Sequence, residues 1–319
     1  MSFAYSRPRT AVDASRALAA AGSLPLGGGT DLIVSIYEGI ARAETLVDLR
    51  RLPGSGEIGE RPGGALRIGA GARIADIAAH PLVTARYPSL ADACTSVGTP
   101  QLRTMGPLGG TLCQRPRCWY FRRGIPCFKR GGSSCPAAEA DGANEHLGIL
   151  DGGPCHAPHP SDPAVPLTAL DATVVVMGNA GERAVPIGEF YASTDVMHET
   201  VLADGEFVAA VELPAASAGG RQHWVKLMQR GAWDFALVSL AAAKRTDGDV
   251  RLVLGGVAPR PWRVNSSIEE DVASGGLDAD TIAILAERAL YDARPLSQNG
   301  YKVRLAETLV RRAIAALVA

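Results

Sequence analysis

A cysteine-rich segment without hydrophobic periodicity constrains the fold of this chain more than any other feature. Four of its six cysteines lie in residues 111–136, TLCQRPRCWYFRRGIPCFKRGGSSCP, and Cys155 follows soon after. From 106 to 160 the sequence is rich in Gly, Pro, Arg and Cys, without a convincing helix or strand. A stretch this long is either functional or disordered. The cysteines and the neighbouring Trp119 and Tyr120 argue against disorder, so something other than a hydrophobic core must organise it.

Periodic patterns on both sides of this segment predict an α+β fold with a domain boundary near 180–220. Strand and helix patterns alternate before it, and strand patterns followed by amphipathic helical patterns come after it. We expect helices over residues 11–22, 30–39, 87–105, 278–290 and 301–319, and strands over 44–52, 206–214 and 223–230. A strand followed by a helix is expected over 65–83, and a helix followed by a strand over 161–178. A further strand pair, 236–245 with 249–259, is expected around the turn TDGD.

The composition excludes several classes of function. Hydrophobic residues make up 47% of the chain, charged residues 20%, and the formal net charge is −1, so the basicity of a nucleic-acid-binding protein is absent. No run of about 18 apolar residues occurs, so no membrane span is expected. The first residues lack the apolar stretch of a signal peptide. We therefore expect a cytoplasmic protein, or a periplasmic one if a partner carries the export signal.

Two glycine-rich stretches predict that the backbone approaches an anionic ligand. Residues 24–32, LPLGGGTDL, place three glycines between a strand and a helix, and residues 104–112, TMGPLGGTL, repeat this chemistry. Successive N–H groups at a helix start form an anion-binding concavity, and two such loops suit a diphosphate held between two subdomains. For the first loop, a tight turn capped by Thr30 or Asp31 is the alternative. Neither stretch matches the Rossmann fingerprint or a P-loop, so NAD and nucleoside triphosphate sites are not supported.

Residues 159–172, HPSDPAVPLTALDA, place a hydroxyl and a carboxylate directly before a proline. Ser161 and Asp162 before Pro163 are typical of a helix N-terminus, which is a structural role. The alternative is that both side chains also form hydrogen bonds to a cofactor.

The cysteine spacing leaves three interpretations open. Cys118, Cys127, Cys135 and Cys155 follow the pattern C-x8-C-x7-C-x19-C. Zinc sites usually contain close C-x2–4-C pairs, and compact ferredoxin spacing is also absent. A [4Fe–4S] cluster tolerates separated ligands on a winding loop, whereas zinc with help from histidine and non-ligand roles remain alternatives. The candidate histidines are His146, His156 and His159.

Two further cysteines and the basic residues of the segment have separate interpretations. Cys113 is interchangeable with any of the four by spacing, but its position behind the second glycine stretch suggests that it packs there. Cys94 is best explained as a small core residue. Six basic residues would offset the charge of an anionic cluster, or form a solvated loop; they are Arg115, Arg117, Arg122, Arg123, Lys129 and Arg130.

With these motifs assembled, the chain resembles the FAD-binding medium subunit of the molybdenum hydroxylases. This family includes xanthine dehydrogenase, carbon monoxide dehydrogenase and bacterial aldehyde oxidoreductases. The resemblance covers nearly the whole chain through LPLGGGTDL, TMGPLGGTL, SDPAVPLTALDA, KLMQRGAWDFALVSLAAA and LGGVAPRPWR. It implies a two-subdomain FAD-binding domain of the vanillyl-alcohol-oxidase/molybdenum-hydroxylase type and a C-terminal α+β domain. The implied boundaries are 1–55 and 56–180 for the two subdomains, with an iron–sulfur insert at about 113–158, and 181–319 for the C-terminal domain.

The insert resembles the cluster-bearing segments of two subgroups, 4-hydroxybenzoyl-CoA reductase and the periplasmic-type aldehyde oxidoreductase. LCQRPRCWYFRRG and the following CFKRGGSSCPA are more similar to the aldehyde oxidoreductase. The resemblance implies a [4Fe–4S] cluster with Cys118, Cys127, Cys135 and Cys155 as its ligands.

The resemblance also implies a set of FAD-binding residues. The two glycine loops would hold the pyrophosphate, Asp162 would bond the ribityl or adenosine part, and Lys226 would lie near the isoalloxazine ring. Trp224 shares a strand face with Lys226 and would either contact the ring or simply pack there. Thr111 stands where relatives often have Asn. The full set is Leu26, Gly27, Gly28, Gly29, Thr30, Asp31, Leu32, Thr104, Gly106, Gly109, Gly110, Thr111, Ser161, Asp162, Trp224 and Lys226.

The implied activity is electron transfer, with substrate chemistry on another subunit. A large molybdenum-cofactor subunit and a small [2Fe–2S] subunit would be the partners, and FAD on this chain would pass electrons to an external acceptor. No persuasive acid–base arrangement is found in this chain, so no catalytic residue is expected. Two alternatives remain: the β subunit of a 4-hydroxybenzoyl-CoA reductase, and a zinc-stapled binding module without redox activity.

Overall fold

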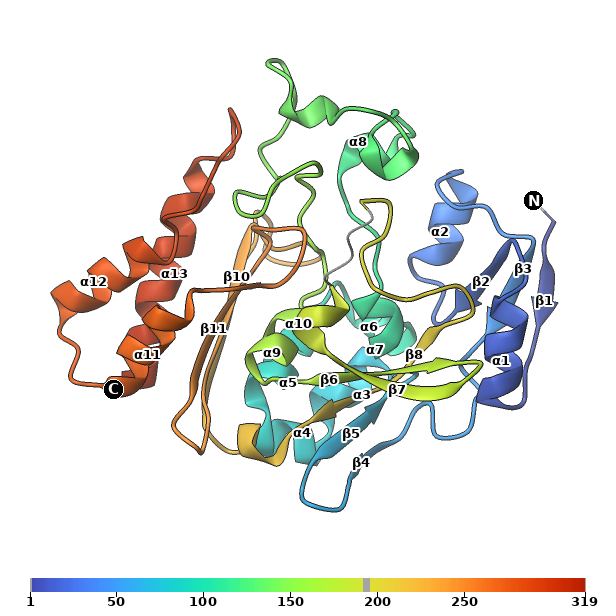
Figure 1. Cartoon of the computed structure of the whole chain (residues 1–319), viewed down its shortest axis with the longest axis horizontal. Helices are drawn as coiled ribbons and strands as arrows, with labels where there is room; N and C mark the ends of the chain where they lie inside the picture. The colour runs from blue at the N-terminus through green and yellow to red at the C-terminus, as the bar shows by residue number, and fades with distance from the viewer. Residues whose placement is uncertain (1, 192–195, 319) are drawn as a thin grey trace.

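The N-terminal unit is a small parallel sheet covered by helices. The computed structural model describes residues 2–191 and 196–318. The sheet has the order β1-β3-β2, with β1 at Ala4–Ser6, β2 at Ser23–Leu26 and β3 at Thr45–Asp48. Helix α1 (Ala11–Leu18) starts where the Thr10 hydroxyl accepts from the Asp13 amide, and α2 (Leu32–Tyr37) follows the first glycine loop. This unit lies at the right of Figure 1, beside the N-terminus.

The second unit is a five-stranded sheet with helices packed on it. The strand order is β4-β5-β8-β6-β7, all antiparallel. The strands are β4 (Ile58–Glu60), β5 (Leu66–Gly69), β6 (Thr173–Gly178), β7 (Gly181–Pro186) and β8 (Phe207–Leu213). The helices are α3 (Ile74–Ala79), α4 (Pro81–Arg86), α5 (Pro88–Thr95), α6 (Pro100–Met105), α7 (Leu108–Leu112), α9 (Ala164–Ala169) and α10 (Ile187–Phe190). The division of the chain at 180 stays a prediction, and this sheet continues past it because β7 and β8 both pair with β6.

The C-terminal unit is a four-stranded antiparallel sheet with three helices. Its order is β12-β11-β10-β9, and β10 pairs with β11 as expected for the strands around TDGD. The strands are β9 (Arg221–Leu227), β10 (Val238–Lys244), β11 (Val250–Gly255) and β12 (Trp262–Arg263), and the helices are α11 (Ser266–Ser274), α12 (Ala279–Arg288) and α13 (Tyr301–Val318).

Strand β10 joins the C-terminal unit to the second unit because both of its faces are buried. Leu240 and Ala242 belong to the core beneath α13, whereas Ala241 and Ala243 belong to the core shared with the five-stranded sheet. This division follows from the alternation of side chains along a strand. Apolar residues on both faces therefore explain why LVSLAAA reads as a continuous hydrophobic run rather than an alternating one.

The cysteine-rich segment forms an arm, residues 113–160, at the top of Figure 1. As expected from its sequence, it has little regular structure: α8 (Trp119–Arg122) and 3-10 turns at Phe128–Arg130 and Pro136–Ala138. Its far end is held by the C-terminal unit. The buried Lys302 donates to the carbonyls of His146 (2.9 Å) and Gly256 (3.0 Å), and Asn299 donates to two further arm carbonyls.

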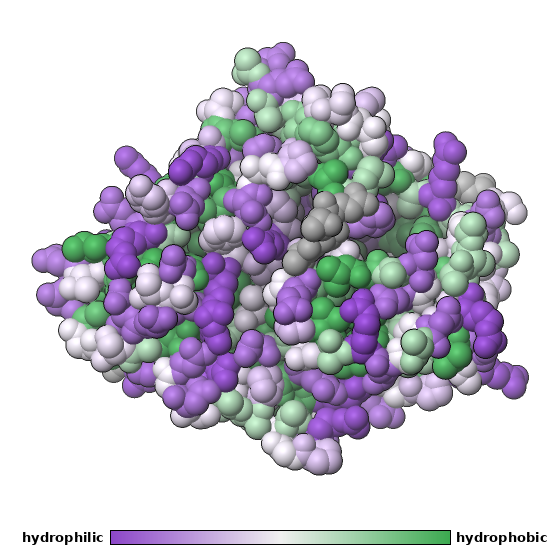
Figure 2. Space-filling view, in the orientation of Figure 1, coloured by the Kyte–Doolittle hydropathy of each residue, from purple (hydrophilic) through white to green (hydrophobic). Residues whose placement is uncertain are grey.

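The outer surface is mixed in character. On the face shown in Figure 2, hydrophilic and hydrophobic residues are interspersed in small patches. Within the described ranges no helix is long and apolar enough to cross a membrane.

Candidate functional site

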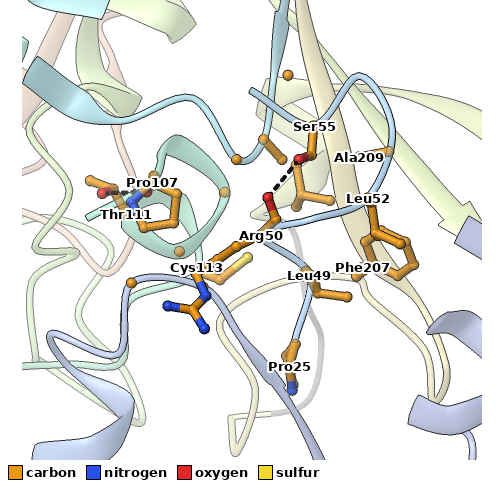
Figure 3. A pocket seen from close by; sticks show the side chains of 18 of the residues that line it. Pro25, Leu49, Arg50, Leu52, Ser55, Pro107, Thr111, Cys113, Phe207 and Ala209 are labelled. Carbon is orange, nitrogen blue, oxygen red and sulfur yellow. Dashed lines mark hydrogen bonds between the residues drawn. The ribbon is translucent and has the colours of Figure 1, made fainter. Parts of the chain in front are cut away.

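A large cavity, called the glycine cavity, lies where the N-terminal unit meets the five-stranded sheet. Its volume is about 780 Å³, within the range of about 300–1,000 Å³ that is usual for cofactor sites. Both glycine loops line it, together with the segment after β3 and strand β8. Figure 3 shows Arg50, Pro107, Cys113 and Phe207 around this space.

The first glycine loop touches the second so closely that side chains are excluded. A Cβ on Gly28 would collide with the carbonyl group of Met105, and one on Gly27 would lie 2.7 Å from Cγ of Pro107. Gly29 has φ +74°, a conformation that favours glycine. The contact between the loops therefore requires glycine at 27 and 28, and the backbone conformation favours it at 29.

The first loop also presents free hydrogen-bond donors. In the part of the chain that the structure describes, the backbone N–H groups of Gly28, Gly29 and Thr30 have no acceptor. All three residues line the glycine cavity. Consecutive unpaired N–H groups suit an anion such as a diphosphate, as the sequence predicts.

The second glycine loop folds into the short helix α7. Gly109 packs against Ala70, where an added Cβ would lie 2.9 Å from the alanine Cβ. The hydroxyl of Thr111 is buried and donates to the carbonyl of Pro107 at 2.9 Å. The side chain of Thr111 thus stabilises its own helix.

Arg50 is a cavity residue that sequence analysis missed. Its guanidinium donates to both carboxylate oxygens of Asp48, at 2.8 and 2.9 Å, and to the hydroxyl of Tyr5 at 3.0 Å. Burial alone would raise the pKa of Asp48, but hydrogen bonds from Arg50 and Tyr5 outweigh it and hold the pKa well below its usual range. Asp48 is therefore charged and fixes a cation at the cavity wall. The sequence signal that could have indicated this role is local: the hydrophobic strand ends in Asp48, and Arg50 follows two residues later.

Ten of the sixteen expected FAD-binding residues line the glycine cavity. They are Gly27, Gly28, Gly29, Thr30, Asp31, Leu32, Gly106, Gly109, Gly110 and Thr111. The carboxylate of Asp31 points to cations of the arm, since it forms ion pairs with Arg117 and Arg122.

Asp162 and Lys226 face each other outside this cavity. Lys226 Nζ lies 2.7 Å from Oδ2 of Asp162 and also donates to the carbonyl of Ser96. Both side chains are buried, 2% and 7% exposed, and burial raises the pKa of Asp162 to about 6 despite the nearby ammonium. The neighbouring Ser161 has a buried hydroxyl without a hydrogen-bond partner among the described residues.

The remaining expected residues also lie outside the cavity lining, each for a local reason. Leu26 packs with Ile36 in the N-terminal core. The hydroxyl of Thr104 donates to a carbonyl of its own helix, and Trp224 packs on the core beneath the five-stranded sheet. For Trp224 this is the packing alternative that the strand alternation allowed.

The arm cysteines line a second, smaller cavity, called the cysteine cavity here. Cys118, Cys127, Cys135 and Cys155 all border it, together with Lys129. Burial raises the pKa of Cys155 to about 11, and burial also raises that of Cys118 although two backbone N–H groups oppose it. Among residues 2–191 and 196–318, no three His, Cys, Asp or Glu side chains are close enough to hold one metal ion.

The other two cysteines lie apart from these four. Cys113 lines the glycine cavity, where burial raises the pKa of its thiol to about 12. Cys94 is fully buried in the core of the second unit, which confirms its interpretation as a small core residue.

Family models match almost the whole chain. The FAD binding domain in molybdopterin dehydrogenase matches residues 1–216, and the CO dehydrogenase flavoprotein C-terminal domain matches residues 223–317. The chain is 35% identical to the aldehyde oxidoreductase FAD-binding subunit PaoB of Escherichia coli K12, with 98% of this chain and 97% of that protein covered. It is 26% identical to the carbon monoxide dehydrogenase medium chain of Hydrogenophaga pseudoflava, over 98% and 96% of the two chains.

Solved structures share the fold. Carbon monoxide dehydrogenase from Hydrogenophaga pseudoflava superposes with a TM-score of 0.77 at 24% identity, covering 99% of this chain and 97% of that chain. Quinoline 2-oxidoreductase from Pseudomonas putida 86 gives 0.76 at 22% identity, covering 100% and 97%. The expected α+β fold, an FAD-binding domain followed by a C-terminal domain, is confirmed.

Both glycine loops border one cavity, and the fold is that of an FAD-binding domain. Together these features define a flavin-binding subunit. The chain belongs to the family of FAD-binding domains in molybdopterin dehydrogenases, and is an FAD subunit of the molybdenum hydroxylase type. The glycine cavity fits the cofactor, because unpaired N–H groups and the Arg50 cation are suited to its diphosphate.

Proposed function

We propose that this chain is the FAD- and [4Fe–4S]-binding electron-transfer subunit of a molybdenum-containing aldehyde oxidoreductase complex. The observation that carries the proposal is the placement of all four expected cysteines around one cavity. The 35% identity to an aldehyde oxidoreductase subunit over 98% of the chain supports the same assignment. When bound, FAD would accept electrons that originate at the molybdenum centre and supply them to an external acceptor.

The described residues form no compact zinc site, and we propose a cluster because the four cysteines border one cavity. Four thiolates about 2.3 Å from one zinc must lie close together, and no such compact group occurs among the described residues. Cys118, Cys127, Cys135 and Cys155 would be the thiolate ligands of a [4Fe–4S] cluster. The buried Lys129 at this cavity supplies a positive charge that would offset the anionic cluster.

In the glycine cavity, this chain's residues bind and orient the cofactor. The N–H groups of residues 28–30 and the guanidinium of Arg50 would bind the diphosphate, which carries the negative charge of FAD. The contacts with the cofactor that the resemblance implies for Asp162, Lys226 and Trp224 remain part of the proposal.

The proposed partners are a large molybdenum-cofactor subunit and a small [2Fe–2S] subunit. Both follow from the membership of the chain in a family of medium subunits. A periplasmic location is proposed only for a complex exported by a signal-bearing partner.

Replacing an arm cysteine tests the cluster. We expect Cys135→Ala to remove iron from the full chain, because a missing ligand exposes the cluster to loss, while Cys113→Ala keeps iron unchanged. The measurement is iron and flavin per chain in the anaerobically purified full chain, separated from the partner subunits so that the iron of their [2Fe–2S] centres is not counted. Iron content equal to one [4Fe–4S] cluster in the native chain is expected, and zinc in place of iron would contradict the proposal.

Substrate assays on the purified complex test the reaction. We expect turnover with aromatic aldehydes and an electron acceptor. Turnover only with an aroyl-CoA and reduced ferredoxin would instead identify a 4-hydroxybenzoyl-CoA reductase.

Replacing Arg50 tests the anion-binding role of the cavity wall. We expect Arg50→Gln to weaken FAD binding about tenfold, since a hydrogen bond to a charged group contributes about 1.5–3 kcal/mol. Fluorescence titration of the deflavinated chain measures the affinity, and Arg51→Gln at the exposed neighbouring position is the control. Equal affinities for both variants would exclude a role for Arg50 in binding.

A further inference from the structure

We propose that Glu199 is a positioning residue that couples the glycine cavity to the cysteine cavity, so that filling one strengthens binding in the other. The inference rests on the proposed function for the identity of the arm's cofactor. The ion pairs on which it depends, those of Glu199 with Arg115 and Lys129, are formed within this chain.

The two cavities share one short stretch of backbone. Cys113, Gln114 and Arg115 line the glycine cavity, and Pro116 and Cys118 line the cysteine cavity. From Arg115 to Cys118 the chain spans at most about 11 Å. A displacement of one wall is therefore transmitted directly to the other.

Glu199 binds one cation from each cavity. Its Oε2 lies 2.9 Å from Nε of Arg115, which lines the glycine cavity, and its Oε1 lies 2.8 Å from Nζ of Lys129, which lines the cysteine cavity. The carboxylate side chain is 9% exposed and that of Lys129 is 7% exposed. At this degree of burial solvent does not replace either charge of the Lys129 pair, so the position of Lys129 depends on the carboxylate. The side chain of Arg115 is 41% exposed, and the same carboxylate holds its guanidinium at the cavity wall.

The backbone beside Glu199 holds the same two cations. Lys129 donates to the carbonyl of Val196 at 2.8 Å, and Arg115 donates to the carbonyl of Met197 at 3.0 Å. The segment from Val196 to Glu199 thus binds the side chains of both Lys129 and Arg115.

Asp31 forms a second connection between the two regions. It lines the glycine cavity and pairs with Arg117 and Arg122, which flank Cys118. Arg122 also donates to Ser35 of α2 at 2.9 Å. Because Asp31 belongs to the glycine loop itself, its replacement would perturb FAD directly. Glu199 lines neither cavity, so an effect of its replacement on FAD must be transmitted.

Coupling between two sites is reciprocal for equilibrium binding. We expect an empty cysteine cavity to weaken FAD binding about tenfold, within the range of about 5–150-fold that is typical of coupled sites. Replacement of Glu199 would remove most of this dependence.

A double-mutant cycle on the full chain tests the coupling. The FAD dissociation constant is measured by fluorescence for the native chain, Cys135→Ala, Glu199→Gln and the double variant, with iron counted in each. We expect Cys135→Ala to raise the constant about tenfold in the native background and to change it less than about twofold in the Glu199→Gln background. The same ratio in both backgrounds, or no effect in either, overturns the inference.

Glu269→Gln is the matched control, because Glu269 is also a buried carboxylate paired with arginine, and lines neither cavity. We expect this variant to retain the full tenfold effect of Cys135→Ala. If it also abolishes the effect, general loss of stability is the cause and coupling through Glu199 is wrong. Should Glu199→Gln fail to fold, Glu199→Asp, which keeps the charge but is shorter, is measured against the same two outcomes.

Iron counts separate this inference from the proposed function. A native chain without iron, or a Cys135→Ala variant that keeps it, contradicts the cluster and the coupling together. Loss of iron in Cys135→Ala with unchanged FAD binding contradicts the coupling alone.

Discussion

Gly28→Ala is expected to lower the affinity for FAD about 10- to 100-fold. The added methyl group would collide with the carbonyl group of Met105, so the first glycine loop must move away from the second. Overpacking of this kind costs about 1–3 kcal/mol, a range that includes the roughly 1.4–2.8 kcal/mol equivalent to a 10- to 100-fold change in a binding constant. The movement would also displace the unpaired N–H groups of Gly29 and Thr30 from the diphosphate. Titration of the deflavinated variant with FAD, followed by flavin fluorescence, measures the loss.

Gly188→Ala is the control for this substitution. Gly188 lies in α10 with nothing within 4 Å of an added Cβ and without a positive φ. We expect native FAD affinity and a native melting temperature for this variant. Retention of normal FAD affinity by a folded Gly28→Ala chain would show that the contact between the two loops does not shape the site.

Lys226→Met is expected to destabilise the folded chain by about 3–5 kcal/mol near neutral pH, because it leaves a buried carboxylate without its counter-ion. The affected group is Asp162, whose side chain is 7% exposed and 2.7 Å from the ammonium. Urea unfolding followed by circular dichroism measures the change. The double variant Lys226→Met with Asp162→Asn is expected to recover part of the stability, because no unpaired charge remains.

The pH dependence of this defect has a definite sign. Burial already raises the pKa of Asp162 from 3.8 to about 6, and removal of Lys226 raises it further. A carboxyl with a raised pKa in the folded state contributes stability at low pH that is lost as pH rises through that pKa. We therefore expect the defect of Lys226→Met to be larger at about pH 8 than at about pH 5.

The same variant distinguishes two roles for Lys226. If the lysine serves mainly the ion pair, a folded Lys226→Met chain binds FAD nearly as well as the native chain. Normal stability with a large loss of FAD affinity would instead support the contact with the isoalloxazine ring that the resemblance implies.

Local sequence was sufficient where backbone geometry and short-range spacing govern the structure. The glycines of both loops were recognised because only glycine tolerates such close backbone contact. The arm was expected to lack regular structure because it has no periodicity, and it does. One helix expected over 87–105 is instead two, α5 and α6. The break has a local reason, since Gly98 has φ +46°, Thr99 caps α6 and Pro100 starts it.

Pairings between distant residues were decided by the tertiary structure. Asp162 and Lys226 are separated by 64 positions, and no periodic pattern links them. Arg50 was missed because its role depends on Tyr5 and Asp48 meeting in neighbouring parallel strands. Likewise, spacing could not exclude Cys113 from the cysteine set, whereas the fold places it on the wall of the other cavity.

The amino-acid sequence alone thus specifies the fold class, the two glycine loops and the cysteine-rich arm. These features depend on periodicity, on the absence of a Cβ and on the types of nearby residues. Only the packed structure shows which side chains face the glycine cavity and which cation borders the cysteines. It also shows which carboxylates form ion pairs with the cations of the arm. Charges are brought together by long-range packing of separate strands and loops, and burial then determines how strongly they interact.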